Sequence, residues 1–169
     1  NQSLGVGISE GFGGGICVDG AGVVRHTVMA ENVARMGGGL ALLAEEKEPA
    51  EGNRYAPSAA GCVVGNNTTI TEAGGVYMRY GGVLNHLAIV NNRCNGANLV
   101  YHGRRYGRSA GIYIDKYGEV FNTVCWGGEV EANSNIQYAA YADASQTEQP
   151  RVHYSAFAQN EITDWSSTI

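Results

Sequence analysis

Apolar and polar residues alternate in four short segments, each introduced by a pair of small residues. The segments read GGICVD, GGLALL, GGVYMR and AGIYID, and they begin at Gly14, Gly38, Gly74 and Ala110. In each, the first and third residues after the pair are apolar, as Ile16 and Val18 are in the first segment. Because side chains alternate between the two faces of a strand, this pattern predicts strands with one buried face.

A second phrase follows most of these segments after a glycine turn. It reads GVVRHTVMAEN from Gly22, GVLNHLAIVNN from Gly82 and GEVFNTVCWGG from Gly118, with GCVVGNN from Gly61 as a shortened form. Each repeat therefore holds at least two strands, and the spacing of about 24 and then about 36 residues suits a solenoid. One repeat cannot bury its own apolar face, whereas stacked repeats share a core. The sequence predicts an all-β solenoid of about four to six coils with parallel sheets.

Asparagine ends most copies of the second phrase. In a parallel stack, equivalent residues lie about 4.8 Å apart along the axis, so identical side chains form ladders. We expect Asn32, Asn66 and Asn92 to hydrogen-bond in such a ladder, which is a structural role.

The repeats are interrupted by two insertions and followed by a less regular tail. Residues 44–59 are polar, acidic and proline-bearing, which indicates a solvated loop, and residues 93–109 are basic and aromatic. Residues 130–169 are expected to form one or two irregular final coils, with strands near 135–139 and 152–157. The whole of 1–169 is expected to be a single domain, cut from a longer protein.

Composition and charge exclude several classes of function. Glycine is abundant (25 residues), only 16% of residues are charged, and the net charge is −5, which gives no basic face for nucleic acid. No apolar run approaches the length of about 20 residues that spans a bilayer, so no membrane insertion is expected. The four cysteines lack zinc-site spacing, and free buried thiols are favoured over disulfides. No metal site or cofactor is expected.

Three features together resemble a known family: GGGI followed by a glycine turn, an asparagine-ended strand, and NTVCWGG at 122–128. They resemble the exported right-handed parallel β-helix repeat proteins of Bacteroidetes and, more distantly, the chlamydial polymorphic outer-membrane proteins. The likeness covers residues 13–128. It implies a right-handed β-helix that is secreted or lies on the exterior of the bacterial outer membrane, and it transfers no catalytic residue.

The outward face of the first strand type holds the first candidate binding residues. If Ile16 and its equivalents point inward, one outward column is Cys17, Ala41, Tyr77 and Tyr113, and the other is Asp19, Leu43, Arg79 and Asp115. The two aspartates would be about 14 Å apart at the sheet spacing, too far for a glycosidase acid/base pair.

Arg79 and Asp115 are expected to form an exposed ion pair. Tyr77 and Tyr113 are expected to stack, either as structure alone or as an exposed platform for a sugar ring. A register slip of one residue would exchange the two faces.

The second insertion holds the remaining candidate binding residues. Its arginines alternate with aromatic residues, as Arg93, Tyr101, His102, Arg104, Arg105, Tyr106 and Arg108. Guanidinium groups beside aromatic rings suit anionic sugars such as uronates or sulfated glycans. The alternative is a solvated loop whose arginines pair with Glu45, Glu46 and Glu48. His26 and His86, at matching positions of the second phrase, are expected to face inward with hydrogen bonds rather than to bind metal.

These features predict a non-catalytic cell-surface or secreted module, adhesin-like or glycan-binding, whose partner is a polysaccharide or a host-cell glycan. Two alternatives stay open. The first is a polysaccharide lyase or glycoside hydrolase of the β-helix type, and the second is a structural stalk or passenger segment. The sequence leaves the oligomeric state open.

Overall fold

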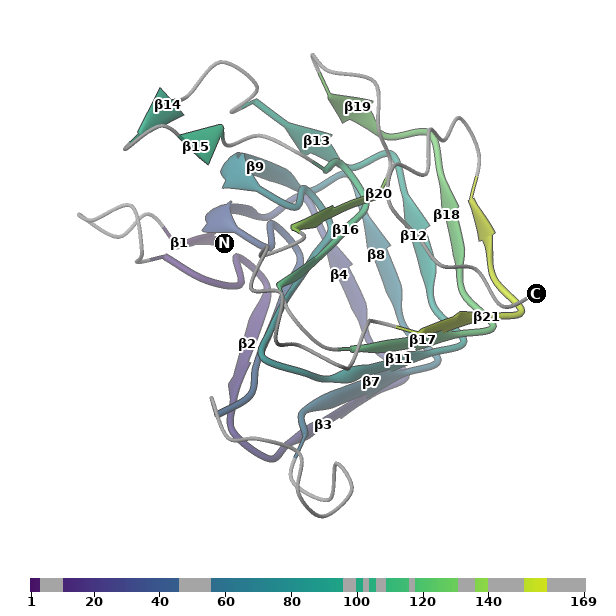
Figure 1. The fold of residues 1–169 in the computed structure, drawn as a ribbon. Helices are drawn as coiled ribbons and strands as arrows, with labels where there is room; N and C mark the ends of the chain where they lie inside the picture. Colours follow the sequence, from purple (N-terminus) through teal and green to yellow (C-terminus); the bar gives the residue numbers. More distant parts are fainter. Residues whose placement is uncertain are drawn as a thin grey trace.

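A computed structural model describes residues 1–3, 11–45, 56–95, 100–101, 104–105, 109–115, 118–130, 136–139 and 151–157. Within these residues the protein consists of strands and turns, with no helix. Four five-stranded sheets contain all the strands except one antiparallel pair. Figure 1 shows the sheets as the sides of one stack.

Each sheet takes one strand from each level of the stack. Sheet A contains β1 (Gln2–Ser3), β5 (Val33–Met36), β9 (Thr68–Glu72), β13 (Arg93–Cys94) and β19 (Glu129–Val130). Sheet B contains β2 (Ile16–Asp19), β6 (Leu40–Leu43), β10 (Val76–Arg79), β16 (Ile112–Asp115) and β20 (Ile136–Ala139). Sheet C contains β3 (Val23–Arg25), β7 (Ser58–Ala60), β11 (Val83–Asn85), β17 (Glu119–Phe121) and β21 (Arg151–His153). Sheet D contains β4 (Val28–Ala30), β8 (Val63–Gly65), β12 (Ala88–Val90), β18 (Val124–Trp126) and β22 (Ala156–Phe157). The antiparallel pair is β14 (Val100–Tyr101) with β15 (Arg104–Arg105).

The chain passes through sheets B, C, D and A in that order and then returns to sheet B. Pairing within each sheet is parallel, and in sheet B it aligns Ile16, Leu40, Val76 and Ile112. The expected all-β class and parallel stacking are confirmed, and the arrangement is compatible with a β-helix or solenoid. The second phrase is two strands rather than one, because a residue with positive φ, such as His26 (49°) or His86 (56°), turns the chain between sheets C and D.

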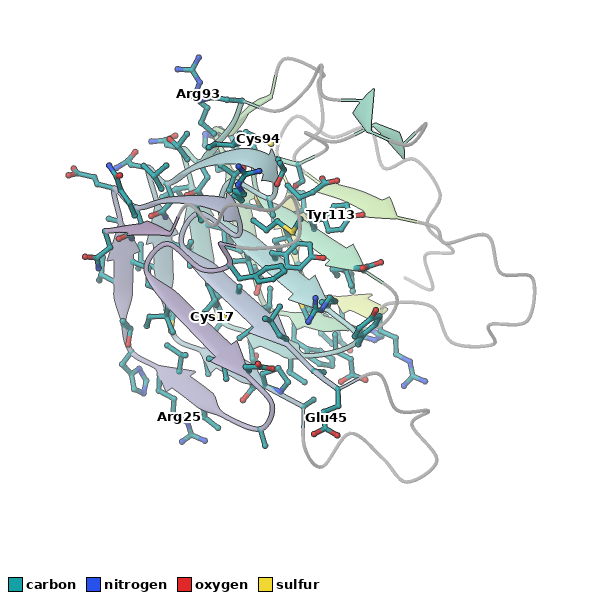
Figure 2. The ribbon with its side chains drawn as sticks, turned by 90° about the vertical axis from the view of Figure 1, so that its left-hand side faces the viewer. Cys17, Arg25, Glu45, Arg93, Cys94 and Tyr113 are labelled. Atoms are coloured by element: carbon teal, nitrogen blue, oxygen red, sulfur yellow. The ribbon has the colours of Figure 1, made fainter. Side chains whose placement is uncertain are left out.

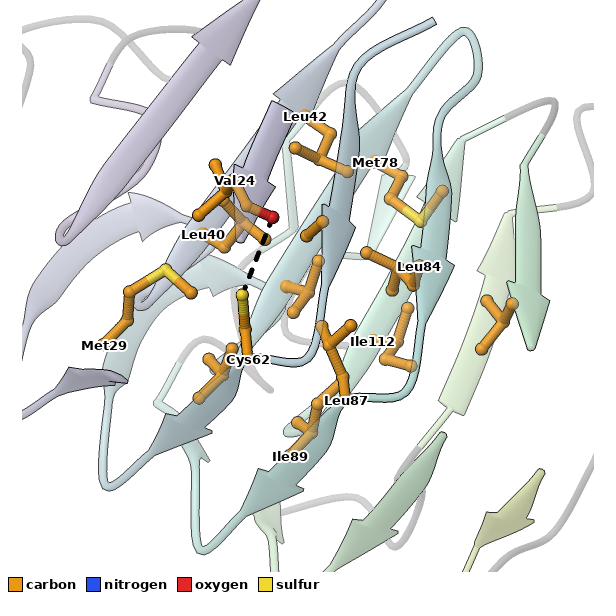
Figure 3. Close-up of a cluster of buried hydrophobic side chains, with 14 of the residues drawn as sticks. Val24, Met29, Leu40, Leu42, Cys62, Met78, Leu84, Leu87, Ile89 and Ile112 are labelled. Atoms are coloured by element: carbon orange, nitrogen blue, oxygen red, sulfur yellow. Dashed lines mark hydrogen bonds between the residues drawn. The ribbon is translucent and has the colours of Figure 1, made fainter. Parts of the chain in front are cut away.

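The core lies inside the stack, where inward side chains from sheets B, C and D meet. It contains Leu40, Val76 and Ile112 from sheet B, as the alternation predicted, together with Leu84 from sheet C and Ile89 from sheet D. Figure 3 shows Leu40, Leu84, Ile89 and Ile112 among the buried side chains between the strands. Burying aliphatic side chains of this size stabilises the fold by roughly 1.5–3 kcal/mol each.

The four cysteines are free, as the sequence favoured. Cys62, Cys94 and Cys125 are buried, whereas Cys17 is exposed on the first strand of sheet B. The Cys62 thiol lies 3.8 Å from the carbonyl oxygen of Val24 in the coil before it (Figure 3).

An asparagine ladder runs up the stack at the corner between sheets D and A. Its members are Asn32, Asn67 and Asn92, each of which directly precedes a strand of sheet A. Oδ1 of Asn67 accepts hydrogen bonds from the backbone N–H and the Nδ2 of Asn32, both at 2.9 Å. Oδ1 of Asn92 accepts the same two bonds from Asn67 at 3.0 Å. The prediction of a ladder is therefore confirmed, but naming Asn66 as a member was wrong. Asn66 is exposed in the turn, with a φ of 54°.

Glycine is required opposite this ladder. A Cβ at Gly39 would lie 2.8 Å from Nδ2 of Asn67 and 2.4 Å from a methyl carbon of Val64. A Cβ at Gly75 would lie 3.0 Å from Nδ2 of Asn92. Gly15, Gly39 and Gly75, the last glycines of the first three small-residue turns, thus each leave room for an asparagine amide, which explains why the two residue types recur together.

The structure moves two of the predicted boundaries and agrees with the strands predicted in the tail. The first insertion is shorter than 44–59, because Ser58–Ala60 is already β7 and pairs with β3 and β11. The second insertion begins after Cys94, because Arg93–Cys94 is β13 of sheet A. In the tail, β20, β21 and β22 pair in register with the coil before them, which confirms strands close to those predicted there. Residues 46–55, 131–135, 140–150 and 158–169 lie outside the described residues.

Candidate functional site

The outer face of sheet B, where an exposed tyrosine platform was one of two alternatives, contains a second buried cluster. Ala41, Tyr77 and Tyr113 do point away from the main core, and they form a separate group with Leu43 and Met36. Tyr113 is 0% exposed and Tyr77 is 5% exposed, so neither ring presents a face to solvent. The alternative of an exposed platform for a sugar ring was therefore wrong, and the alternative of Tyr77 and Tyr113 stacking as structure alone agrees with their burial.

The burial of these rings has a structural cause. β5 and β9 of sheet A bring Met36 and, just after β9, Ala73 into the same cluster, and Phe12 packs against it. The ring of Phe12 lies 5.6 Å from the ring of Tyr77. Figure 2 looks onto this face, with Cys17 on its first strand and Tyr113 further along the stack.

The stacking of Tyr77 on Tyr113 is confirmed, with ring centroids 5.5 Å apart and planes 5° apart. Burial is the main reason that the pKa of Tyr77 lies well above its ordinary value. The charge of Asp115 and the neighbouring Tyr113 raise this pKa further, and Arg79 opposes them. The Tyr77 phenol is therefore neutral over the physiological range and serves as packing rather than as a base.

Arg79 lies level with Asp115 in the sheet, but the expected ion pair between them was wrong. The guanidinium carbon lies 5.2 Å from the ring centroid of Phe12 and 5.3 Å from that of Tyr80. Among the described residues, Arg79 forms no ion pair, and its buried Nε has no hydrogen-bond partner. The arginine is held by two aromatic rings at the edge of the second cluster, where cation–π contacts replace the carboxylate.

The aspartates of the same column do not form an acid/base pair. Asp19 and Asp115 are separated by the strands of Leu43 and Arg79, so three strand spacings, about 14 Å, lie between them. Within the described part of the chain, no group of three or more His, Cys, Asp or Glu residues could hold a metal ion. The histidines expected to face inward, His26 and His86, are instead exposed in the turns between sheets C and D.

The arginine-rich segment forms an element that sequence reasoning missed, an antiparallel hairpin. β14 and β15 pair Tyr101 with Arg104 and Val100 with Arg105. Figure 1 shows this hairpin outside the stack, on the side of sheet A. Arg93 is exposed on β13, and Figure 2 shows its side chain pointing away from the stack. Tyr106 and Arg108, like His102, lie outside the described residues.

The outer face of sheet D is an exposed apolar surface that the sequence reasoning also missed. Its inward residues, such as Met29 and Ile89, belong to the core. Every outward position on its five strands is also apolar, namely Val28, Ala30, Val63, Gly65, Ala88, Val90, Val124, Trp126 and Ala156. Val28 is 70% exposed and Trp126 is 63% exposed. The signal was present in the strand sequences VMA, VVG, AIV and VCW, which are apolar on both faces.

No protein-family model, curated protein or solved structure matches the chain significantly. In the described residues, no helix is both long and apolar enough to cross a membrane.

Proposed function

We propose that the chain is part of an exported, right-handed parallel β-helix that binds anionic glycans at a cell surface without cleaving them. The right-handed sense follows from the resemblance of the repeats and from the strong preference of parallel crossover connections for that hand. Export and surface placement follow from the resemblance alone.

The register of the β14–β15 hairpin is the observation that carries glycan binding. The backbone register pairs Tyr101 with Arg104 and Val100 with Arg105, so a tyrosine and an arginine share one cross-strand position and a second arginine occupies the next. A guanidinium group binds a carboxylate or sulfate through two parallel hydrogen bonds, and an aromatic ring beside it can receive the apolar face of a sugar. The hairpin interrupts the coils between β13 and β16, a place where insertions decorate a repeat scaffold.

Glycan binding through this hairpin is tested with neutral, uronate-containing and sulfated polysaccharides at low and high salt. We expect salt-sensitive binding to the anionic polymers, because ionic contacts are screened as ionic strength rises. Arg104→Ala combined with Arg105→Ala should weaken binding at least tenfold. Arg25→Ala combined with Arg151→Ala removes two exposed arginines of sheet C, which is the same change in net charge, and serves as the matched control.

Three results would contradict the proposal. An equal loss of affinity for the anionic polymers in the hairpin variant and in the control variant would show that binding depends on net charge alone. Shortening of the polymer in the same samples would favour the lyase or hydrolase alternative. Absence of binding to all polymers would favour a structural stalk.

A further inference from the structure

The outer faces of sheets B, C and D differ in a way that makes sheet D unusual. Sheet C carries charged residues on its outer face, such as Arg25, Glu119 and Arg151, and this face suits water. On the outer side of sheet B, the column that contains Ala41, Tyr77 and Tyr113 is apolar in its later strands, and the protein buries it: Ala41 and Tyr113 are both 0% exposed. Strands that are apolar on both faces are those of sheets covered on both sides. Sheet D has such strands, yet its outer face is open.

We propose that the outer face of sheet D is a docking surface for a second copy of this chain, packed sheet against sheet about a twofold axis parallel to the coil axis. Apart from Trp126, the outward residues of sheet D are valine, alanine and glycine, and such a layer fits another apolar sheet, as in sandwich folds. A twofold contact needs a surface that is complementary to itself. Because sheet D is itself such an apolar sheet, a second copy of it can be the partner.

The residues along the two long edges of sheet D favour this orientation. The edge toward sheet C carries Arg25 and His26, and the edge toward sheet A carries Glu31 in the same coil. A twofold axis parallel to the coils sets each edge against the opposite edge of the partner, at the same level. Arg25 of one copy then faces Glu31 of the other, which is a complementary charge arrangement.

The same operation sets large side chains against small ones. Trp126 lies on the edge toward sheet A, so it faces the outward column of the partner that is nearer sheet C. That column contains Ala88 and Ala156 on either side of Val124. The exposed indole of Trp126 therefore lies opposite Val124 of the partner, with the small side chains of Ala88 and Ala156 on either side of that valine, and buried tryptophans often dominate the energy of an interface.

The size of the face predicts a weak dimer rather than a permanent one. The strip between His26 and Glu31 is about 16 Å wide, and five strands make it about 24 Å long, or about 400 Å² in projection. A standard stable interface buries about 800 Å² of accessible surface on each partner. We therefore expect a dissociation constant in the micromolar range or weaker.

The test is sedimentation equilibrium of the whole chain from about 1 µM to about 1 mM, a range that brackets such a constant. We expect a reversible monomer–dimer equilibrium. Val63→Lys should weaken dimerisation at least tenfold, because a lysine at the centre of the face loses water without gaining a partner. Val23→Lys is the matched control, because Val23 is a 58% exposed valine on sheet C. Monomers at every concentration would overturn the proposal, and so would equal weakening by both variants.

Orientation is tested by disulfide trapping in a Cys17→Ser background, which removes the exposed native thiol. We expect His26→Cys and Glu31→Cys chains, mixed in equal amounts and oxidised, to form the mixed disulfide in preference to either symmetric one. Preferential symmetric crosslinks would overturn the parallel twofold arrangement. The glycan-binding hairpin plays no part in either experiment, so failure here leaves the proposed function standing.

Discussion

At the scale of single residues, two adjacent asparagines, Asn66 and Asn67, have different roles, because only Asn67 belongs to the ladder. Asn67 is 0% exposed, and its side chain joins Asn32, Asn92 and the carbonyl oxygen of Met29. Asn66 precedes it in the chain, is exposed, and has a left-handed φ of 54°. The sequence shows the pair NN, and the choice between the two depends on a turn residue that only the backbone conformation reveals. This is why the ladder was predictable and its middle member was not.

Replacing the middle member of the ladder should destabilise the protein strongly. Asn67→Ala removes the acceptor for two donors of Asn32 and the donor to Asn92, and it leaves buried polar groups without partners. We expect the free energy of unfolding to fall by about 2–4 kcal/mol, since each such group costs about 1–3 kcal/mol. Urea unfolding followed by circular dichroism measures the change.

The matched control for this variant is Asn66→Gly, because glycine accepts the left-handed conformation of that turn. Its free energy of unfolding should stay within about 0.5 kcal/mol of the unchanged protein, as for other exposed positions. If Asn66→Gly lowered the free energy of unfolding as much as Asn67→Ala does, the ladder would not be what stabilises this corner.

At the scale of strands, alternation predicted which side chains point inward but not what covers the other face. Ile112 and Ile114 enter the main core as expected, and Tyr113 points the opposite way, also as expected. Its burial depends on Phe12 and on β5 and β9, which are far away in sequence. A period of two carries no information about such a covering layer. The stacking of the two tyrosines was therefore predictable, but the choice between a buried pair and an exposed platform was not.

A substitution on each of two outer faces distinguishes a covered sheet from an open one. Tyr113→Ala should lower the free energy of unfolding by about 3–5 kcal/mol, the usual cost of emptying a buried aromatic site. Phe121→Ala on sheet C is the matched control, because its ring is only partly buried and stacks on His153 at 5.2 Å. We expect it to cost about 1 kcal/mol or less, in the range of an aromatic pair contact. If calorimetry gave the same loss in the free energy of unfolding for both variants, that result would contradict a second core layer on sheet B.

At the scale of the whole molecule, the repeats predicted the parallel stack but neither the hairpin nor the open outer face of sheet D. Four repeated phrases were enough to infer coils with a shared core, because stacking is the way such units bury their apolar faces. The hairpin of β14 and β15 arises inside an insertion without a repeat, so no periodicity indicated it. The apolar outer face of sheet D was visible in its strands, but a strand that is apolar on both faces normally indicates two-sided burial.

The two hydrophobic clusters should lose stability together at alkaline pH if they belong to one cooperative unit. Burial raises the pKa of Cys125, in the main core, from about 9 to about 12. Burial, with Asp115 next, also raises the pKa of Tyr77, in the second cluster. Both groups stay neutral in the folded state and ionise more readily when unfolded. Their contribution to stability is therefore complete below about pH 9 and is lost as the pH rises toward 12.

We expect circular dichroism to show one alkaline unfolding transition, coincident with the appearance of tyrosinate absorbance from the Tyr77 cluster. Cys125→Ala and Tyr77→Phe should each make the free energy of unfolding less dependent on pH above about 9, because each removes one group that ionises on unfolding. Tyr154→Phe serves as the control, since Tyr154 is 89% exposed. Two separate transitions, each moved by only one of the first two variants, would mean that the layer on sheet B unfolds independently of the stack. In that case Tyr113→Ala should leave the main transition unchanged, so the two experiments together decide whether the second cluster is part of the fold's single core or a separable cover.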